Sequence, residues 1–121
     1  MNGVFSIPIG ESGKGPVLYA TIMSTEETGM MYRTTAGEFE AYNVANYGSY
    51  PLGVTEIGQT GIYQFMLPDP LMIPGRRYVV LIHEKSLPVS APSVEDLLVH
   101  SGAIEVVTIA PCTVGVDVRS N

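Results

Sequence analysis

The sequence predicts an all-β fold, a sandwich of two antiparallel sheets, and three observations point to it. The chain has 121 residues, the size of one domain with one hydrophobic core. Thirteen glycines and nine prolines are spaced so that turns recur often, which suits many short strands and disfavours long helices. The segments between these breaks are rich in valine, isoleucine and tyrosine, which are enriched in strands.

The N-terminal residues 1–15 are rich in glycine, and we expect them to form an extended arm outside the core. The sandwich domain is expected over 16–109, and the residues 110–121 are expected to be a C-terminal strand or tail. Val17 to Met23 combines β-branched and aromatic residues and ends at a polar run, so it predicts the first core strand.

Shorter elements follow up to the middle of the chain. Residues 30–35 predict a short strand, 37–44 a strand or a helical turn, and 45–49 a loop. The segment 50–55 is interrupted by Pro51 and Gly53, which predicts an edge or bulged strand, because proline cannot donate to a sheet.

Two segments in the second half have the clearest strand patterns. In 62–67 the residues Tyr63, Phe65 and Leu67 fall on one face, which predicts a half-buried strand. In 76–85 both faces are apolar, so this strand is expected to have neighbours above and below or to pack against a partner chain.

The C-terminal third predicts one short helix and two more strands. Ser93 is a suitable N-cap for a helix over 93–100, and Gly102 would end that helix. Residues 103–109 predict a last core strand, and 113–118 alternate valine with other residues, as a strand does.

Charge and cysteine content exclude several classes of function. The formal net charge is −6, with only six lysines and arginines, so binding to nucleic acid or to an anionic membrane is disfavoured. No apolar run approaches the roughly 18 residues of a membrane span. The single cysteine, Cys112, allows no intrachain disulfide and no cysteine-based metal site. The first residues lack the pattern of a secretory signal, so synthesis in the cytoplasm without export is expected.

A succession of motifs occupies the middle of the chain: Thr55-Glu56, then Gly61-Ile62-Tyr63-Gln64-Phe65, then Pro74-Gly75, and finally Tyr78-Val79-Val80. This succession resembles prealbumin-like and other immunoglobulin-like β-sandwich modules. In those modules a glycine opens a strand, an aromatic residue fills the core, and a Pro-Gly pair turns into the next strand. Glu56 stands where the modules carry Asp, and the turn from Pro68 to Pro74 is longer than theirs.

A second set of motifs spans the stretch from Leu18 to Glu84. They are Leu18-Tyr19-Ala20, Gly37-Glu38-Phe39-Glu40-Ala41-Tyr42, Thr55-Glu56, Gly61-Ile62-Tyr63 and Gly75-Arg76-Arg77-Tyr78. With these motifs the stretch resembles small uncharacterised proteins of tailed phages and of some bacterial genomes. This resemblance implies a virion-associated β-module and implies no catalytic residue.

Catalytic and metal-binding groups are sparse. His83 and His100 are the only histidines; His83 is expected to be a strand or interface residue, and His100 to stabilise the end of the short helix. Glu38 and Glu40 would share a strand face, and a solvated edge is favoured there over a Ca²⁺ site. Gly10 to Gly15 lacks the Ser or Thr after Lys14 that a phosphate loop needs. We therefore expect no catalytic residue, no cofactor and no metal.

Partner-binding residues are instead expected on apolar surfaces, because only 15% of the residues are charged. The terminal segments contain apolar residues that are suited to add strands to another subunit, and a tyrosine-rich loop is suited to contact a glycan or a partner. These candidates are Phe5, Ile7, Ile9, Tyr42, Tyr47, Tyr50, Val114, Val116 and Val118. Tyr19, Tyr63 and Tyr78 are expected in the core, and Arg76-Arg77 is expected to pair with carboxylates of a neighbouring strand or subunit.

The sequence therefore favours a non-enzymatic structural protein that binds itself or a capsid or tail protein as part of an oligomer or larger assembly. With the resemblance, the implied role is a virion component, such as a capsid decoration or a head–tail or tail accessory protein. The alternative is a carbohydrate- or receptor-binding module that uses Tyr42, Tyr47 and Tyr50. A hydrolase would need a nucleophile and a base that the sequence pattern does not provide.

Overall fold

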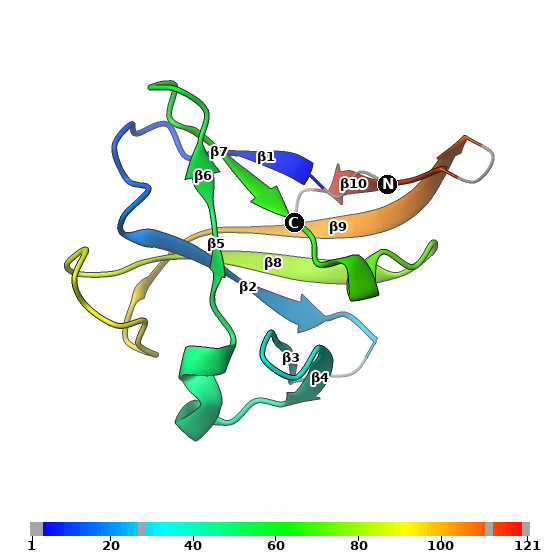
Figure 1. Ribbon diagram of the computed structural model, residues 1–121, viewed down its shortest axis with the longest axis horizontal. Helices are drawn as coiled ribbons and strands as arrows, with labels where there is room; N and C mark the ends of the chain where they lie inside the picture. Colours follow the sequence, from blue (N-terminus) through cyan, green and yellow to red (C-terminus); the bar gives the residue numbers. More distant parts are fainter. Residues whose placement is uncertain (1–3, 27–28, 111–112, 120–121) are drawn as a thin grey trace.

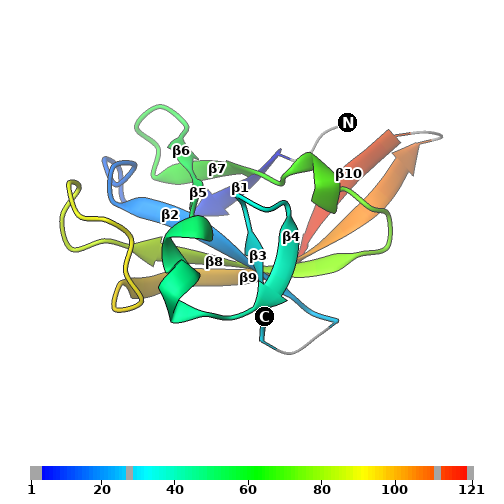
Figure 2. The ribbon, with the colours of Figure 1, turned by 60° about the horizontal axis from the view of Figure 1, so that its bottom comes forward.

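Two antiparallel sheets pack against each other and confirm the predicted all-β sandwich (Figures 1 and 2). The computed structural model describes the backbone of residues 4–26, 29–110 and 113–119 and the side chains of 6–26 and 29–107. The strands are β1 (Val4–Pro8), β2 (Leu18–Ser24), β3 (Met30–Arg33), β4 (Glu38–Ala41), β5 (Leu52–Gly53), β6 (Thr55–Glu56), β7 (Ile62–Met66), β8 (Arg77–Glu84), β9 (Leu97–Ala110) and β10 (Thr113–Arg119). Two short 3-10 helices, η1 (Val44–Ser49) and η2 (Asp69–Leu71), lie between strands.

The larger sheet has the order β10-β9-β8-β2-β3-β4, and β5 adds to β2 beside β3. The smaller sheet has the order β1-β7-β6. In Figure 2 the small sheet lies above the strands β2, β8 and β9 of the large sheet. None of the helices within the described ranges is long and apolar enough to cross a membrane.

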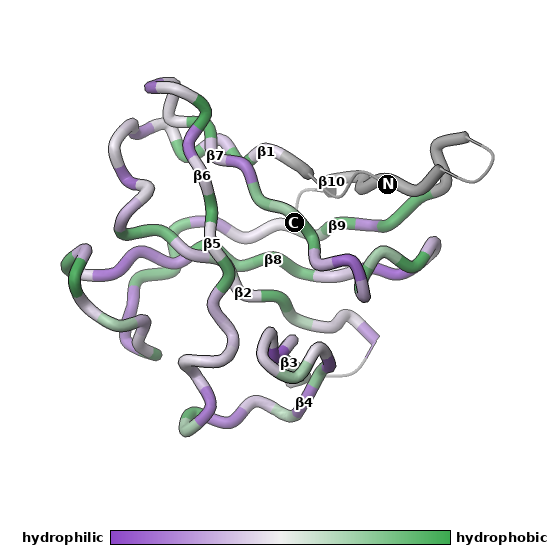
Figure 3. Tube along the Cα trace, in the orientation of Figure 1, coloured by the Kyte–Doolittle hydropathy of each residue, from purple (hydrophilic) through white to green (hydrophobic). Residues whose placement is uncertain are grey.

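The core lies between the sheets and follows the strand alternation. On β7 the side chains of Tyr63 and Phe65 are buried, as is Leu67 just after it, whereas Ile62 and Met66 point outward. The hydropathy trace in Figure 3 shows apolar residues along β8 and β9 and polar residues on many of the connections. The prediction that Tyr63, Phe65 and Leu67 share a buried face is confirmed.

Strand β2 is buried on both faces, which explains the lack of strict alternation in its sequence. Ala20 and Ile22 belong to the core between the sheets. On the opposite face Tyr19 joins a second cluster with Met31, Tyr47 and Tyr50. The second cluster covers part of the outer face of the large sheet, the face turned away from the small sheet.

The N-terminal segment is part of the sandwich, so the prediction of an arm outside the core is wrong for Val4–Pro8. These residues pair with β7 over five positions, and Ile7 is opposite Tyr63 with 3% of its surface exposed. Glycine and proline in this segment shape a turn and do not prevent strand pairing. The turn after β1 is also held, because the backbone N–H of Lys14 donates to the Tyr63 hydroxyl at 2.8 Å.

Gly61 explains how closely this turn approaches β7. Its φ is +75°, in the left-handed region that favours glycine. A Cβ on Gly61 would lie 2.9 Å from the backbone nitrogen of Glu11 and 2.9 Å from the carbonyl carbon of Gly10. The backbone N–H groups of Ile9 and Gly10 both donate to the Gly61 carbonyl oxygen. The absence of a side chain thus permits this backbone contact.

The helix predicted over 93–100 is wrong, because β9 begins at Leu97. Ser93 does cap a structure, but that structure is a single turn. Its hydroxyl accepts from the N–H of Glu95, and the carboxylate of Asp96 accepts from the N–H of Ser93. A short helix is stabilised mainly by packing, and here the residues from Leu97 onward pair with β8 instead. This pairing places His100 opposite Ile82. His100 therefore lies within a strand and not at a helix end.

The C-terminal strand β10 pairs with β9 over Thr113–Arg119 and forms one edge of the large sheet. The strand β9 extends to Ala110, one residue beyond the expected domain limit at 109. The side chains of Phe5, Val114, Val116 and Val118 lie outside the described part of the structure, as does Cys112.

Candidate functional site: a groove on the outer face of the large sheet

A groove with a volume of about 460 Å³ lies on the outer face of the large sheet. Strands β2, β3 and β8 form its floor. Helix η1 and the segment between β4 and η1 form one wall, and the start of β9 with the turn before it forms the other. The residues that line it are Thr21, Met23, Gly29, Met31, Tyr42, Tyr47, Leu81, His83, Val94, Asp96 and Leu98. We call this the outer groove.

Strand alternation positions the floor. Thr21, Met23 and Leu81 fall on the face opposite the core because Ala20, Ile22 and Ile82 point into the core. The apolar second face of β8, noted in the sequence, therefore contributes Leu81 to an open groove. Within the described residues, η1 and the connection from β8 to β9 cover this face only in part.

A hydrogen-bonded group of four residues forms the polar side of the outer groove. The Tyr19 hydroxyl donates to Oδ2 of Asp96 at 2.7 Å, and the N–H of Ser93 donates to the same oxygen at 2.8 Å. The hydroxyls of Tyr19 and Tyr47 are 2.9 Å apart. Because the one hydroxyl hydrogen of Tyr19 is directed to Asp96, Tyr47 is the donor in this pair.

The second polar contact joins two neighbouring strands. The Thr21 hydroxyl and Nε2 of His83 are 3.0 Å apart, and the His83 ring stacks on Tyr19 with a centroid distance of 5.0 Å. A hydroxyl beside an imidazole is the geometry of a nucleophile and its base. Thr21 is fully buried, however, and in the described part of the chain no carboxylate is hydrogen-bonded to His83 to orient it. The sequence pattern did not reveal this pair, because Thr21 and His83 are far apart in the chain.

Burial determines the protonation states of His83 and Tyr19 in the groove. It lowers the pKa of His83 below its ordinary value, although the negative charge of Asp96 opposes this shift. Burial raises the pKa of the Tyr19 hydroxyl far above its ordinary value, and its hydrogen bonds with Tyr47 and Asp96 add to the effect. At neutral pH the imidazole and the tyrosines are therefore uncharged.

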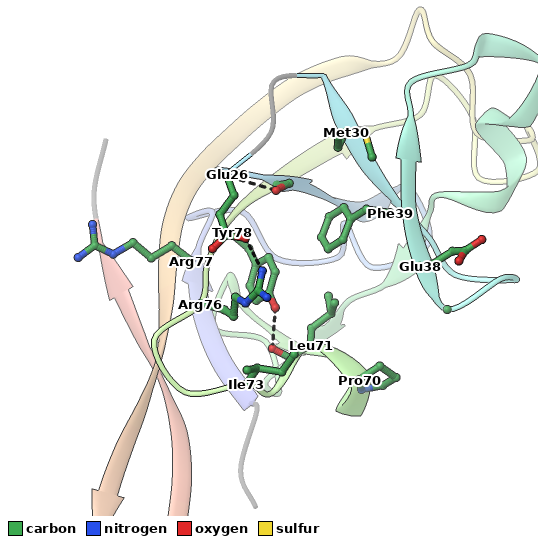
Figure 4. A pocket seen from close by; sticks show the side chains of 12 residues that line it. Glu26, Met30, Glu38, Phe39, Pro70, Leu71, Ile73, Arg76, Arg77 and Tyr78 are labelled. Carbon is green, nitrogen blue, oxygen red and sulfur yellow. Dashed lines mark hydrogen bonds and ion pairs between the residues drawn. The ribbon is translucent and has the colours of Figure 1, made fainter.

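A smaller pocket of about 290 Å³ opens between β3, β4, η2 and the start of β8 (Figure 4). The rings of Phe39 and Tyr78 stack inside it with centroids 5.8 Å apart. Arg76 forms an ion pair with Glu26, and Arg77 lies 3.6 Å from Glu105 on β9. The prediction that both arginines pair with carboxylates is confirmed. Both arginines that line this pocket are therefore ion-paired, and a further carboxylate in its lining, that of Glu38, is exposed.

The predicted tyrosine loop is assembled but largely buried. Tyr42 and Tyr47 each contact the Tyr50 ring, with centroids 6.0 and 6.1 Å from it. Tyr50 is completely buried and Tyr47 is 9% exposed, whereas Tyr42 is 47% exposed. The expectation that all three face a partner is therefore wrong. The Tyr50 hydroxyl donates to Glu40, so this tyrosine connects β4 with η1.

The other sequence candidates separate into buried and exposed groups. Ile7 is buried in the core, and Ile9 is partly buried and packs against it. Tyr19, Tyr63 and Tyr78 are buried as predicted. Across the described side chains, no group of three or more histidine, cysteine, aspartate or glutamate residues is placed to hold a metal ion.

The two carboxylates of β4 have different surroundings. Glu38 is exposed, while Glu40 accepts hydrogen bonds from Tyr50 and from the Asn46 side chain and lies 3.4 Å from Arg33. These hydrogen bonds, chiefly that of Tyr50, lower the pKa of Glu40. Glu40 thus has a structural role in joining β3, β4 and η1.

Comparison with known proteins assigns the chain to no family. No family model matches the chain, and no curated protein or solved structure is significantly similar to it.

Proposed function

We propose that this chain is a non-enzymatic structural protein that joins neighbouring subunits of a larger assembly through exposed apolar side chains. The observation that carries the proposal is the apolar end of the molecule, which we define as Leu87, Val89 and Leu97. Their exposed fractions are 58%, 91% and 65%. In Figure 1 the connection between β8 and β9, which includes Leu87 and Val89, extends from the left of the sandwich. Exposed apolar patches generally mark interfaces.

The sandwich behind this end is suited to such a role. Leu97 is the first residue of β9 and is opposite Glu84 at the end of β8. The hairpin of β8 and β9 lies inside the large sheet, with β2 on one side and β10 on the other. Leu97 is thus held in the sheet, whereas Leu87 and Val89 lie in the connection between the two strands, which presents them to a partner.

The proposal extends to a virion component of a tailed phage, either a capsid decoration or a head–tail or tail accessory protein, located in the virion. Support for this part comes from the motifs between Leu18 and Glu84. The immunoglobulin-like, prealbumin-like subclass of the sandwich is likewise proposed, on the strength of Gly61 at the start of β7 and the Pro74-Gly75 turn before β8. The partner is a second copy of the chain or a capsid or tail protein.

Solution mass tests the assembly role. Size-exclusion chromatography with light scattering is carried out on the full chain and on a variant with Leu87→Ser, Val89→Asp and Leu97→Lys. We expect a defined oligomer that falls to the monomer mass in the variant. Met66→Gln is the control, because Met66 is also an exposed apolar residue, at 66%, but lies on the small sheet.

Substitution is a sharper test than deletion of residues 1–15, because that deletion would remove β1 and the buried Ile7. If the full chain is monomeric at high micromolar concentration, self-assembly is excluded. If the variant keeps the oligomer, the apolar end is not the interface.

A further inference from the structure

We propose that the outer groove binds a small organic cation, an ammonium group carried on an apolar chain or ring, with the ammonium at Asp96. This inference goes beyond the assembly role and rests on different residues from the apolar end. The observation behind it is a half-buried carboxylate that has no cationic partner among the described residues and faces an apolar groove.

The charge of Asp96 is incompletely compensated. Both donors that reach it, the Tyr19 hydroxyl and the Ser93 N–H, bond to Oδ2. No described residue donates a hydrogen bond to Oδ1, and no lysine or arginine of the described part forms an ion pair with Asp96. His83 lies across the same groove, but burial lowers its pKa and leaves it neutral at pH 7. Partly buried charges are normally paired, so a cation is the complementary ligand.

The rest of the groove suits an apolar body attached to this cation. Met23, Met31, Leu81 and Leu98 supply apolar surface, and methionine side chains adapt readily to ligands of different shape. Its volume of about 460 Å³ is within the usual range of small-molecule sites, about 300–1,000 Å³. Tyr42 and Tyr47 add aromatic rings to the lining of the groove, and aromatic rings attract ammonium groups.

Other ligand classes fit less well. A carboxylate or a phosphate would be repelled by Asp96, and no described lysine or arginine lines the groove to offset this repulsion. A neutral apolar molecule would fill the groove but would desolvate Asp96 without pairing its charge. An ammonium group on an apolar body both pairs the charge of Asp96 and fills the apolar part of the groove.

Titration calorimetry with matched probes tests the proposal on the full chain. The probes are hexylammonium, hexanol and hexanoate, which share the apolar chain and differ in charge. We expect hexylammonium to bind at least tenfold more tightly than hexanol, and hexanoate to bind most weakly. NMR signals of the Met23 and Met31 methyl groups, assigned by Met→Leu substitution, report whether binding occurs in this groove.

Asp96→Asn is the key variant, because it removes the charge but keeps an oxygen for the Tyr19 and Ser93 hydrogen bonds. It should reduce hexylammonium affinity at least tenfold and leave hexanol binding unchanged. Asp69→Asn is the matched control, since it changes net charge equally at an exposed site on η2. Leu98→Trp is a second variant that narrows the groove without altering the Tyr19–Asp96 bond, and it should weaken all probes.

Four results would overturn the inference. Equal affinity for hexylammonium and hexanol would mean that Asp96 does not bind the ammonium group. Equal losses of hexylammonium affinity in Asp96→Asn and Asp69→Asn would indicate only long-range electrostatic attraction. Binding heat without a shift of the two methionine methyl signals would place the cation elsewhere. A concentration-dependent shift of these methyl signals without any probe would assign the groove to a second copy of the chain.

These outcomes are separable from the assembly proposal. Loss of hexylammonium binding in Asp96→Asn would not change the solution mass, because Asp96 is not part of the apolar end. A monomeric full chain would likewise leave the calorimetric result intact.

Discussion

The 2.7 Å hydrogen bond from the Tyr19 hydroxyl to Oδ2 of Asp96 connects β2, near the middle of the large sheet, with the turn that precedes β9. The same hydroxyl accepts from Tyr47, so three segments distant in sequence meet at one oxygen atom. Buried hydroxyls of this kind are costly to leave unpaired.

Tyr19→Phe should therefore lower the free energy of unfolding by about 1–2 kcal/mol, because it leaves Tyr47 and Asp96 each without one partner. Urea denaturation followed by circular dichroism measures this change. Tyr42→Phe is the control, since no described residue forms a hydrogen bond with the Tyr42 hydroxyl and its side chain is half-exposed. Equal stabilities of the two variants would mean that the hydrogen bonds at Tyr19 contribute nothing.

Gly61→Ala should destabilise the protein by about 2–4 kcal/mol, combining a strained backbone angle with a steric clash. The clash is with the backbone of Gly10 and Glu11, which cannot rotate away as a side chain would. Thermal and urea unfolding provide the measurement.

Gly58→Ala separates the two contributions. Gly58 has a φ of +58°, but a Cβ there would meet nothing within 4 Å. We expect a loss of about 1 kcal/mol for this variant, from backbone strain alone. A cost at Gly61 no larger than at Gly58 would contradict the close approach of the N-terminal turn.

Glu40→Gln should reduce the acid sensitivity of the protein. Hydrogen bonds from Tyr50 and Asn46 hold the pKa of Glu40 below its ordinary value of 4.5. A lowered carboxyl pKa gives a stabilisation that is fully present above the ordinary pKa and is lost as the pH falls toward the folded-state pKa. The unfolding free energy of Glu40→Gln should therefore change less steeply than that of wild type below about pH 4.5.

Glu38→Gln is the matched control for this prediction, because Glu38 is on the same strand but exposed. It should retain the wild-type slope in urea titrations at several pH values. If Glu40→Gln and Glu38→Gln have the same slope, the bonds of Glu40 to β3 and η1 do not stabilise the charged form.

His83→Gln should flatten the stability profile below about pH 6.5. Burial lowers the folded-state pKa of His83 below its ordinary value of 6.5, so the unfolded chain binds the proton more readily. The wild type should thus lose stability as the pH falls below about 6.5, and the variant should lose less. His100→Gln is the control, since His100 is the only other histidine. Parallel profiles for wild type and His83→Gln would contradict this burial effect.

The sequence was informative wherever alternation was regular. Tyr63, Phe65 and Leu67 were predicted on one buried face because a strand with one solvated side alternates strictly. The β5–β6 region was predicted as an irregular edge because Pro51 and Gly53 disrupt pairing. These are local patterns, and local patterns are visible in a single chain.

Long-range pairing was not predictable in the same way. Ile7 looked like part of a free arm because nothing near it in the chain shows that β7 is its partner. The turn at Ser93 was interpreted as a helix start because the same cap serves both structures, and only pairing of β9 with β8 decides between them. The outer groove was missed for this reason too, since Asp96, Tyr19 and His83 are brought together by strand order alone.

The segment Leu52–Glu56 belongs to both sheets. Leu52 and Gly53 pair with β2 in the large sheet, and Thr55 and Glu56 pair with β7 in the small sheet, with only Val54 between them. A sideways slip of one sheet over the other would have to break one of these two pairings. Under a shearing load the sandwich should therefore yield as one unit, so that force applied at one layer is carried directly into the other.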